Sequence, residues 1–125
     1  AWFSTWTGKD GSLIFTSYDD FDPASIYGHD VTGSEARVVI KLKNADGSNV
    51  GKARYEATYK KDKKPAHQVS EFNVSTEKLA GGVFDSNGYV DFTYFGTDFT
   101  CGTIKADDGR SKIEGTFITH YKKVN

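Results

Sequence analysis

The chain has one cysteine, two prolines and no methionine among its 125 residues. A single cysteine excludes an internal disulfide and a thiolate zinc site, so packing has to stabilise the fold. No window approaches the roughly 18 apolar residues that a membrane-spanning helix needs, so we expect no membrane insertion. The absence of Met, including at position 1, favours a secreted or extracytoplasmic chain whose leader has been removed.

Excess charge of one sign is also lacking. The formal net charge is −1 and the sequence pI is about 6.3, so there is no general attraction to nucleic acid. The three histidines, at positions 29, 67 and 120, show no spacing typical of a metal site. We therefore expect neither a nucleic-acid partner nor a metal, and no cofactor motif is present. The oligomeric state stays open.

Aromatic residues are plentiful, with nine Phe, seven Tyr and two Trp making up 14% of the chain. A chain of this length suits one domain, here residues 1–125, with one continuous core. Because buried Tyr and Trp need partners for their O–H and N–H groups, this composition favours a sheet interior with some polar positions.

Turn signals divide the chain into short segments, since Asp-Gly and Asn-Gly pairs supply the positive φ angles of hairpin turns. Such pairs stand at 10–11, 46–47, 87–88 and 108–109. The segments between them predict about eight strands, at 1–7, 12–17, 35–43, 50–60, 67–75, 88–95, 98–106 and 111–122. No segment has the apolar spacing of a long helix.

The most regular pattern lies in residues 52–60, where charged or hydroxyl side chains alternate with Ala and Tyr. Because side chains alternate between the faces of a strand, one face is predicted to carry Ala53, Tyr55, Ala57 and Tyr59. Charged residues such as Arg54 would then face water. The row alternates small and large side chains, which leaves room beside each Tyr for a neighbour or a ligand.

These features predict an all-β fold, and we favour a single-domain antiparallel barrel of about eight strands over a two-sheet β-sandwich. Short hairpins dominate, alternating small and large interior residues suit a barrel, and closure removes exposed strand edges. In a barrel the first and last strands would be neighbours.

Two resemblances support the barrel. Trp6-Thr7-Gly8, together with an aromatic and basic last strand, resembles the calycin barrels of lipocalins and avidins, although the calycin Gly ahead of the Trp is absent. The segment 46–51, which runs into the strand with Tyr55 and Tyr59, resembles the barrel of allene oxide cyclases and dirigent proteins. Both resemblances concern the fold, which does not fix function.

The leading functional hypothesis is an extracellular protein that holds a small apolar or aromatic ligand inside the barrel, with tyrosine hydroxyls orienting it. A filled core is the competing interpretation of the same residues. The candidate ligand-binding residues are Tyr55, Tyr59, Phe72, Phe92, Tyr94 and Phe117.

Two other classes of function remain open. A carbohydrate-binding module or lectin would use exposed Trp2, Trp6 or Tyr89 to stack on sugar faces. A barrel enzyme, such as a cyclase or isomerase, would enclose a reactive intermediate; its catalytic residues are unknown, with an inner-row Tyr such as Tyr59 the first candidate for acid or base. The sequon at Asn73 could accept a glycan in a eukaryotic secretory route.

Overall fold

The computed structural model describes residues 2–7, 9–19, 28–58, 63–78, 82–83, 87–107 and 112–121, and for residues 2–7, 82–83, 87 and 107 it describes the backbone only. This part of the chain contains strands and no helix. The strands are β1 (Trp2–Thr7), β2 (Asp10–Thr16), β3 (Ala36–Asn44), β4 (Arg54–Ala57), β5 (His67–Thr76), β6 (Gly82–Val83), β7 (Asn87–Phe95), β8 (Phe99–Asp107) and β9 (Lys112–Tyr121).

The strands form one sheet that curls into a barrel. Its order is β3-β2-β1-β9-β8-β7-β4-β5, and a further pairing of β3 with β5 joins the ends of this row. β6 pairs with β5 at Asn73 and Val74, farther along that strand than β4 does. The prediction of an all-β barrel of about eight strands with neighbouring first and last strands is confirmed, since β1 pairs with β9.

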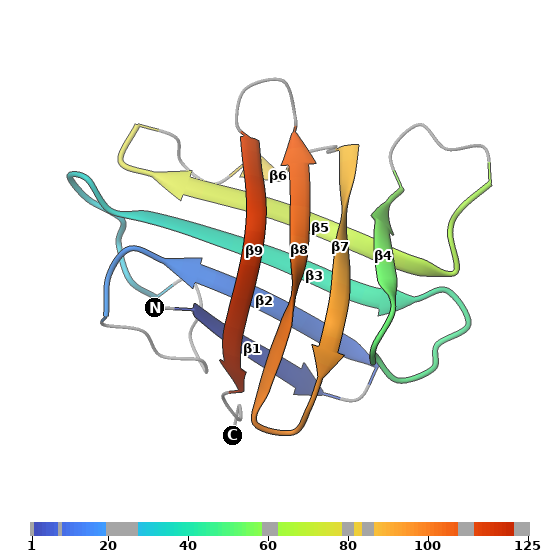
Figure 1. The fold of residues 1–125 in the computed structure, drawn as a ribbon. Coiled ribbons are helices and arrows are strands. Elements are labelled where there is room, and N and C mark those ends of the chain that lie inside the picture. Colours follow the sequence, from blue (N-terminus) through green and yellow to red (C-terminus); the bar gives the residue numbers. More distant parts are fainter. Residues whose placement is uncertain are drawn as a thin grey trace.

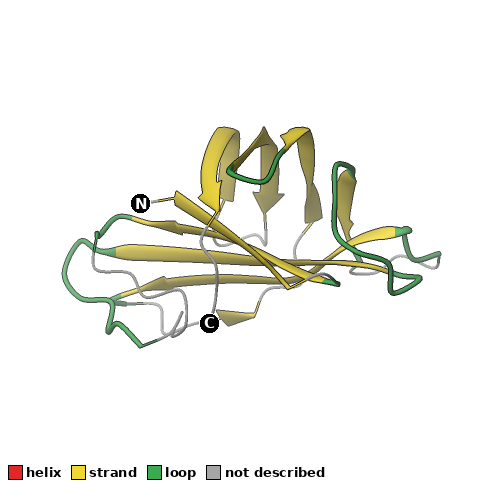
Figure 2. Cartoon of the chain, turned by 90° about the horizontal axis from the view of Figure 1, so that it is seen from below, coloured by secondary structure: helices red, strands yellow, loops and turns green. Residues whose placement is uncertain are grey.

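Within the barrel, the strands lie in two layers that cross at a steep angle. β1, β2, β3 and β5 form one layer, and β9, β8, β7 and β4 lie across it (Figures 1 and 2). The layers join where β1 meets β9 and where β4 meets β5, and both junctions are short parallel pairings. The prediction of a purely antiparallel barrel is therefore wrong at these two junctions.

The parallel junction at β4 arises because β3 and β4 do not form the hairpin that the sequence predicts. Between them, Asp46 accepts hydrogen bonds from the backbone N–H and hydroxyl of Ser48, which hold the pKa of the Asp46 carboxyl below its ordinary value of 3.8. Asn44 donates to the Asn49 carbonyl at 2.8 Å and fixes the same turn. The chain then enters the other layer, and β3 pairs with β5 instead.

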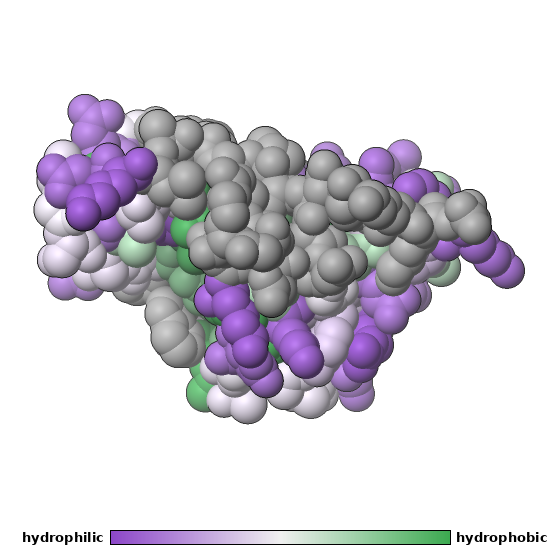
Figure 3. Space-filling view, turned by 90° about the horizontal axis from the view of Figure 1, so that it is seen from above, coloured by the Kyte–Doolittle hydropathy of each residue, from purple (hydrophilic) through white to green (hydrophobic). Residues whose placement is uncertain are grey.

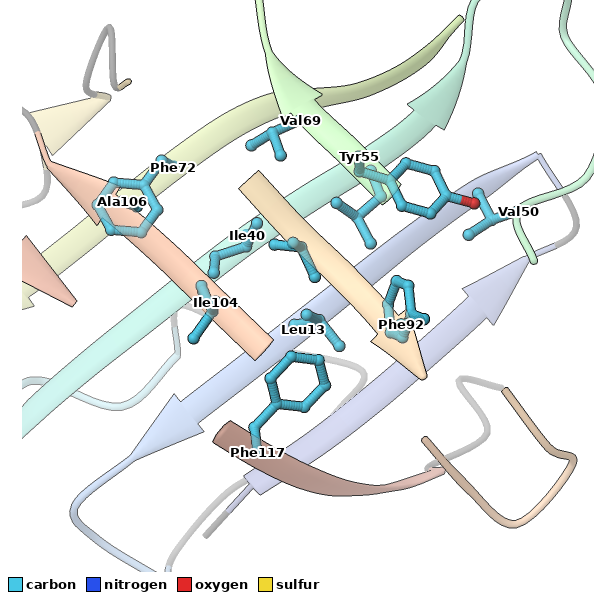
Figure 4. Packing of buried hydrophobic residues seen from close by; sticks show 12 residues of the cluster. Leu13, Ile40, Val50, Tyr55, Val69, Phe72, Phe92, Ile104, Ala106 and Phe117 are labelled. Atoms are coloured by element: carbon cyan, nitrogen blue, oxygen red, sulfur yellow. The ribbon is translucent and has the colours of Figure 1, made fainter. Parts of the chain in front are cut away.

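The core fills the space between the two layers with the inner rows of the strands (Figure 4). Tyr55 is fully buried, and its ring meets Phe92 edge to face at a centroid distance of 5.7 Å. Phe92 meets Phe117 in the same way at 5.8 Å, which links β4, β7 and β9. Burial of these rings contributes most of the stabilisation available to a fold without disulfides.

The outer face of β2, β3 and β5 is buried as well, which the alternation in the sequence does not predict. Ile14 and Val39, which pair across β2 and β3, are both 0% exposed. Arg37 on the same face donates to the His29 carbonyl at 3.0 Å and to the Ser75 hydroxyl at 3.4 Å. Asn73 is also buried, and its side-chain oxygen accepts from Ser75, so the folded chain does not present the sequon as a glycan acceptor.

Candidate functional site

An apolar groove of about 370 Å³ opens at one end of the barrel. It lies between the first half of β9 and the adjoining ends of β2 and β3. The apolar side chains that line it are Phe15, Val38, Ile104, Ile113 and Phe117. The volume stands at the lower end of the roughly 300–1,000 Å³ that ligand pockets span, so the groove suits a small ligand.

The groove exists because β1 covers only one end of β9. Their pairing consists of Phe3 with His120 and Ser4 with Tyr121, and among the described residues no strand pairs with the earlier part of β9 on that side. The inner row of β9 also lacks a side chain at Gly115, where an added Cβ would meet nothing within 4 Å. The missing neighbour and the missing side chain together leave the space open.

Three polar groups at the rim, those of Thr16, Ser17 and Glu114, bind other residues of the chain. The Thr16 hydroxyl donates to the Tyr18 carbonyl at 2.7 Å, and the Ser17 hydroxyl accepts from the Ala36 backbone N–H at 2.8 Å. Glu114 forms an ion pair with Lys112 at 3.2 Å, and both side chains are more than half exposed. A ligand therefore meets an apolar wall with one carboxylate at its margin, which disfavours an acidic ligand.

Of the predicted ligand-binding residues, Phe117 lines the groove. Phe72 and Phe92 are buried in the core, where they are 1% and 2% exposed. The Tyr55 hydroxyl donates to the Gly51 carbonyl at 2.8 Å and accepts from the Gly51 N–H at 2.9 Å. Burial raises the pKa of Tyr55 above its ordinary value of 10.0, so this hydroxyl stays neutral and is occupied by the backbone.

Tyr94 does not face the interior, so the prediction that it lines the barrel is wrong. It is 48% exposed, and its ring stacks on Phe99 at 4.7 Å. A β-bulge between Phe92 and Tyr94 shifts the register of β7 against β8 and reverses the alternation on which the prediction depended. Phe95 takes the inward position and packs against the core. Tyr59 lies outside the described residues.

The three candidate sugar-binding residues lie in two strands, β1 and β7. Trp2 and Trp6 lie in β1, opposite Phe15 and Gly11 of β2, and their side chains are outside the described part of the structure. Tyr89 in β7 is half-buried, and the Arg54 guanidinium lies over its ring, 3.8 Å from the centroid. This cation–π contact covers one face that a sugar would need for stacking.

The candidate ligand-binding residues predicted from the sequence do not include the groove wall formed by β2, β3 and β8. Val38 and Ile113 lie in strands that the sequence predicts, but nothing in the sequence shows that Phe15, Val38 and Ile113 line one space. The available signal was Gly115, a residue without a side chain in the middle of an inner row. Such a position leaves a gap unless a neighbouring side chain fills it.

A second cluster of polar residues lies on the outer face, around His29. His29 stacks on Tyr18 with ring centroids 4.0 Å apart, and its Nε2 hydrogen-bonds to the Glu35 carboxylate at 3.2 Å. Hydrogen bonding to the Thr32 backbone N–H, followed by that to His29, lowers the pKa of Glu35 from 4.5. These contacts join His29 to Glu35 and Tyr18, and Arg37 of β3 donates to the His29 carbonyl at 3.0 Å, so the cluster has a structural role.

Comparisons of the chain with models of protein families, with curated proteins and with solved structures found no match. The resemblances to calycins and to allene oxide cyclases therefore stay predictions. Within the described ranges, no helix is long and apolar enough to cross a membrane. The function is therefore inferred from the geometry of the groove.

Proposed function

We propose that this protein binds a small, neutral, largely apolar or aromatic ligand in the groove beside β9, and that it does so outside the cytoplasm. One observation carries the proposal: about 370 Å³ of space is walled by apolar side chains, including Phe117, a member of the buried core, and Phe15, which packs against that core. Contact between water and apolar walls is unfavourable. An apolar ligand that displaces the water from a space of this size is therefore expected to bind favourably.

The rest of the described surface has few large exposed hydrophobic side chains that could bind such a ligand. From above, both hydrophobic and hydrophilic residues are visible on the described surface (Figure 3). Three large hydrophobic side chains are exposed elsewhere, and two of them, Tyr94 and Phe99, already stack on each other. The groove is a concave apolar site of the described structure, and its rim carboxylate, Glu114, favours a neutral ligand over an anionic one.

A neutral fluorescent probe tests this proposal. N-phenyl-1-naphthylamine, which brightens in apolar surroundings, is expected to bind saturably to the folded protein. Ala36 lines the groove on the same face of β3 as Val38, so the substitution Ala36→Phe would fill part of the space. We expect Ala36→Phe to weaken probe binding at least tenfold, as measured by fluorescence titration.

Two controls separate filling of the groove from other effects. Ala66→Phe makes the same chemical change at an exposed position away from the groove and should leave the affinity unchanged. Tyr55→Phe should also leave it unchanged, because that hydroxyl bonds to Gly51. Equal binding by wild type and Ala36→Phe, or no saturable binding by folded wild type, would contradict the proposal.

A further inference from the structure

The groove has a second property that an apolar pocket does not need: one of its walls is a strand edge with which no described strand pairs. Five consecutive residues of β9, numbers 113–117, line it. Alternate side chains of a strand point to opposite faces, so a lining that includes inward-facing residues and the residues between them fits a space that extends along the edge of the strand. Glu114 and Thr116 thus reach the groove although their side chains are exposed.

The hydrogen-bond pattern of β8 and β9 shows which backbone groups face the groove. The Tyr121 N–H donates to the Asp98 carbonyl at 2.8 Å, and the register continues without a shift from His120 to Lys112. In an antiparallel pair, every second residue exchanges both hydrogen bonds with its partner, and the residues between direct their groups to the other side. The odd-numbered residues of β9 therefore bond to β8, whereas Glu114, Thr116 and Ile118 direct N–H and C=O toward the groove side.

This edge continues a pairing that the fold already uses. β1 lies along the same side of β9 and pairs there with His120 and Tyr121. Its first described residue is Trp2. No described strand pairs with this edge of β9 before His120, which includes the residues that line the groove. A segment laid against it would occupy the line of β1, with side chains on its inner face against Phe15 and Val38.

We infer that the ligand of the groove is an extended polypeptide segment, which adds a strand to the free edge of β9 and places alternate apolar side chains against the apolar wall. This inference rests on the proposed function and names its ligand class. Strand addition supplies main-chain hydrogen bonds for affinity and side-chain pockets for specificity. It also covers an exposed strand edge, which folded proteins rarely leave open.

The test uses the peptide acetyl-Val-Thr-Val-Thr-Val-amide as a competitor of N-phenyl-1-naphthylamine on the wild-type protein. Two analogues carry N-methyl groups, one on the three Val nitrogens and the other on the two Thr nitrogens. Only one of these sets can point at β9 when the Val side chains face the wall, because N–H direction and side-chain direction alternate together along a strand. We expect the peptide to displace the probe and one analogue to bind at least tenfold more weakly than the other.

A protein variant tests the same edge independently. Thr116→Pro removes an N–H on the groove side without removing a bond to β8, and proline is tolerated on such an edge. It should weaken peptide binding at least tenfold. Thr97→Pro is the matched control, because Thr97 is exposed and lies in the turn of the β7–β8 hairpin, which Gly96 closes by donating to the Phe99 carbonyl at 3.0 Å. Thr97→Pro should bind the peptide as wild type does.

The outcomes distinguish the inference from the proposed function. If the probe binds but the peptide does not compete, or if both analogues match the parent peptide, strand addition is overturned and binding of a small apolar ligand stands. If the folded protein does not bind the probe at all, the proposed function fails. Should Thr116→Pro fail to fold, the comparison of the two analogues on wild type still decides the question.

Discussion

Replacing Tyr55 with alanine is expected to lower the free energy of unfolding by about 3–5 kcal/mol. The side chain is fully buried, its ring meets His67 and Phe92 at 5.3 and 5.7 Å, and its hydroxyl bonds twice to Gly51. Truncation removes the ring contacts, opens a cavity and leaves the Gly51 backbone groups without this partner. Denaturation by urea, followed by circular dichroism, gives the magnitude.

The neighbouring residue is the control, because it shares the strand but faces outward. Glu56 is partly exposed and forms an ion pair with Arg54 at 3.6 Å. Exposed pairs of this kind contribute well under about 1 kcal/mol, so Glu56→Ala should cost no more than that. Similar losses for the two variants would mean that β4 does not have the inward and outward faces described above.

Substituting Gly102 with alanine should cost roughly 3 kcal/mol, at the upper end for overpacking. A Cβ at this position would stand 2.2 Å from the Asp91 carbonyl oxygen and 3.0 Å from the Phe117 ring. The oxygen belongs to the backbone of β7, so relief requires β7 and β8 to move apart in the middle of the barrel. Thermal or chemical denaturation measures the loss.

Gly51→Ala provides the comparison for this second variant. An added Cβ at Gly51 meets nothing within 4 Å, and its φ is not in the left-handed region. Its stability should stay within about 0.5 kcal/mol of wild type. A neutral Gly102→Ala would show that β7 and β8 are packed less closely than described.

The sequence predicts local structure well where a strand obeys simple alternation. β3 is predicted at 35–43 and found at Ala36–Asn44, and Phe117, predicted to line the interior, is buried and lines the groove. The short loops and turn residues limit where strands can begin and end, so their bounds follow from local chemistry.

Alternation fails where the register changes or where both faces are covered. The bulge before Tyr94 shifts the pairing by one residue and turns that ring outward. The segment with the clearest alternation forms only a four-residue strand, Arg54–Ala57, because the chain crosses there from one layer to the other. Val39 lies on the outer face of β3 and is nevertheless fully buried.

The groove could not be predicted from the sequence because it depends on how strands that are distant in the sequence pair with one another. Its walls come from β2, β3, β8 and β9, and it stays open because β1 pairs with only the end of β9. Strand order and the relative lengths of neighbouring strands are tertiary properties, which a hydrophobic pattern does not encode.

The most direct test of the account is to map the bound probe by NMR. On titration with N-phenyl-1-naphthylamine, methyl and ring signals of Val38, Ile113 and Phe117 should shift, while those of Val69 and Val90 near Tyr55 should stay in place. Shifts confined to the Tyr55 end of the barrel, or spread over its outer surface, would contradict the claim that the groove beside β9 is the binding site.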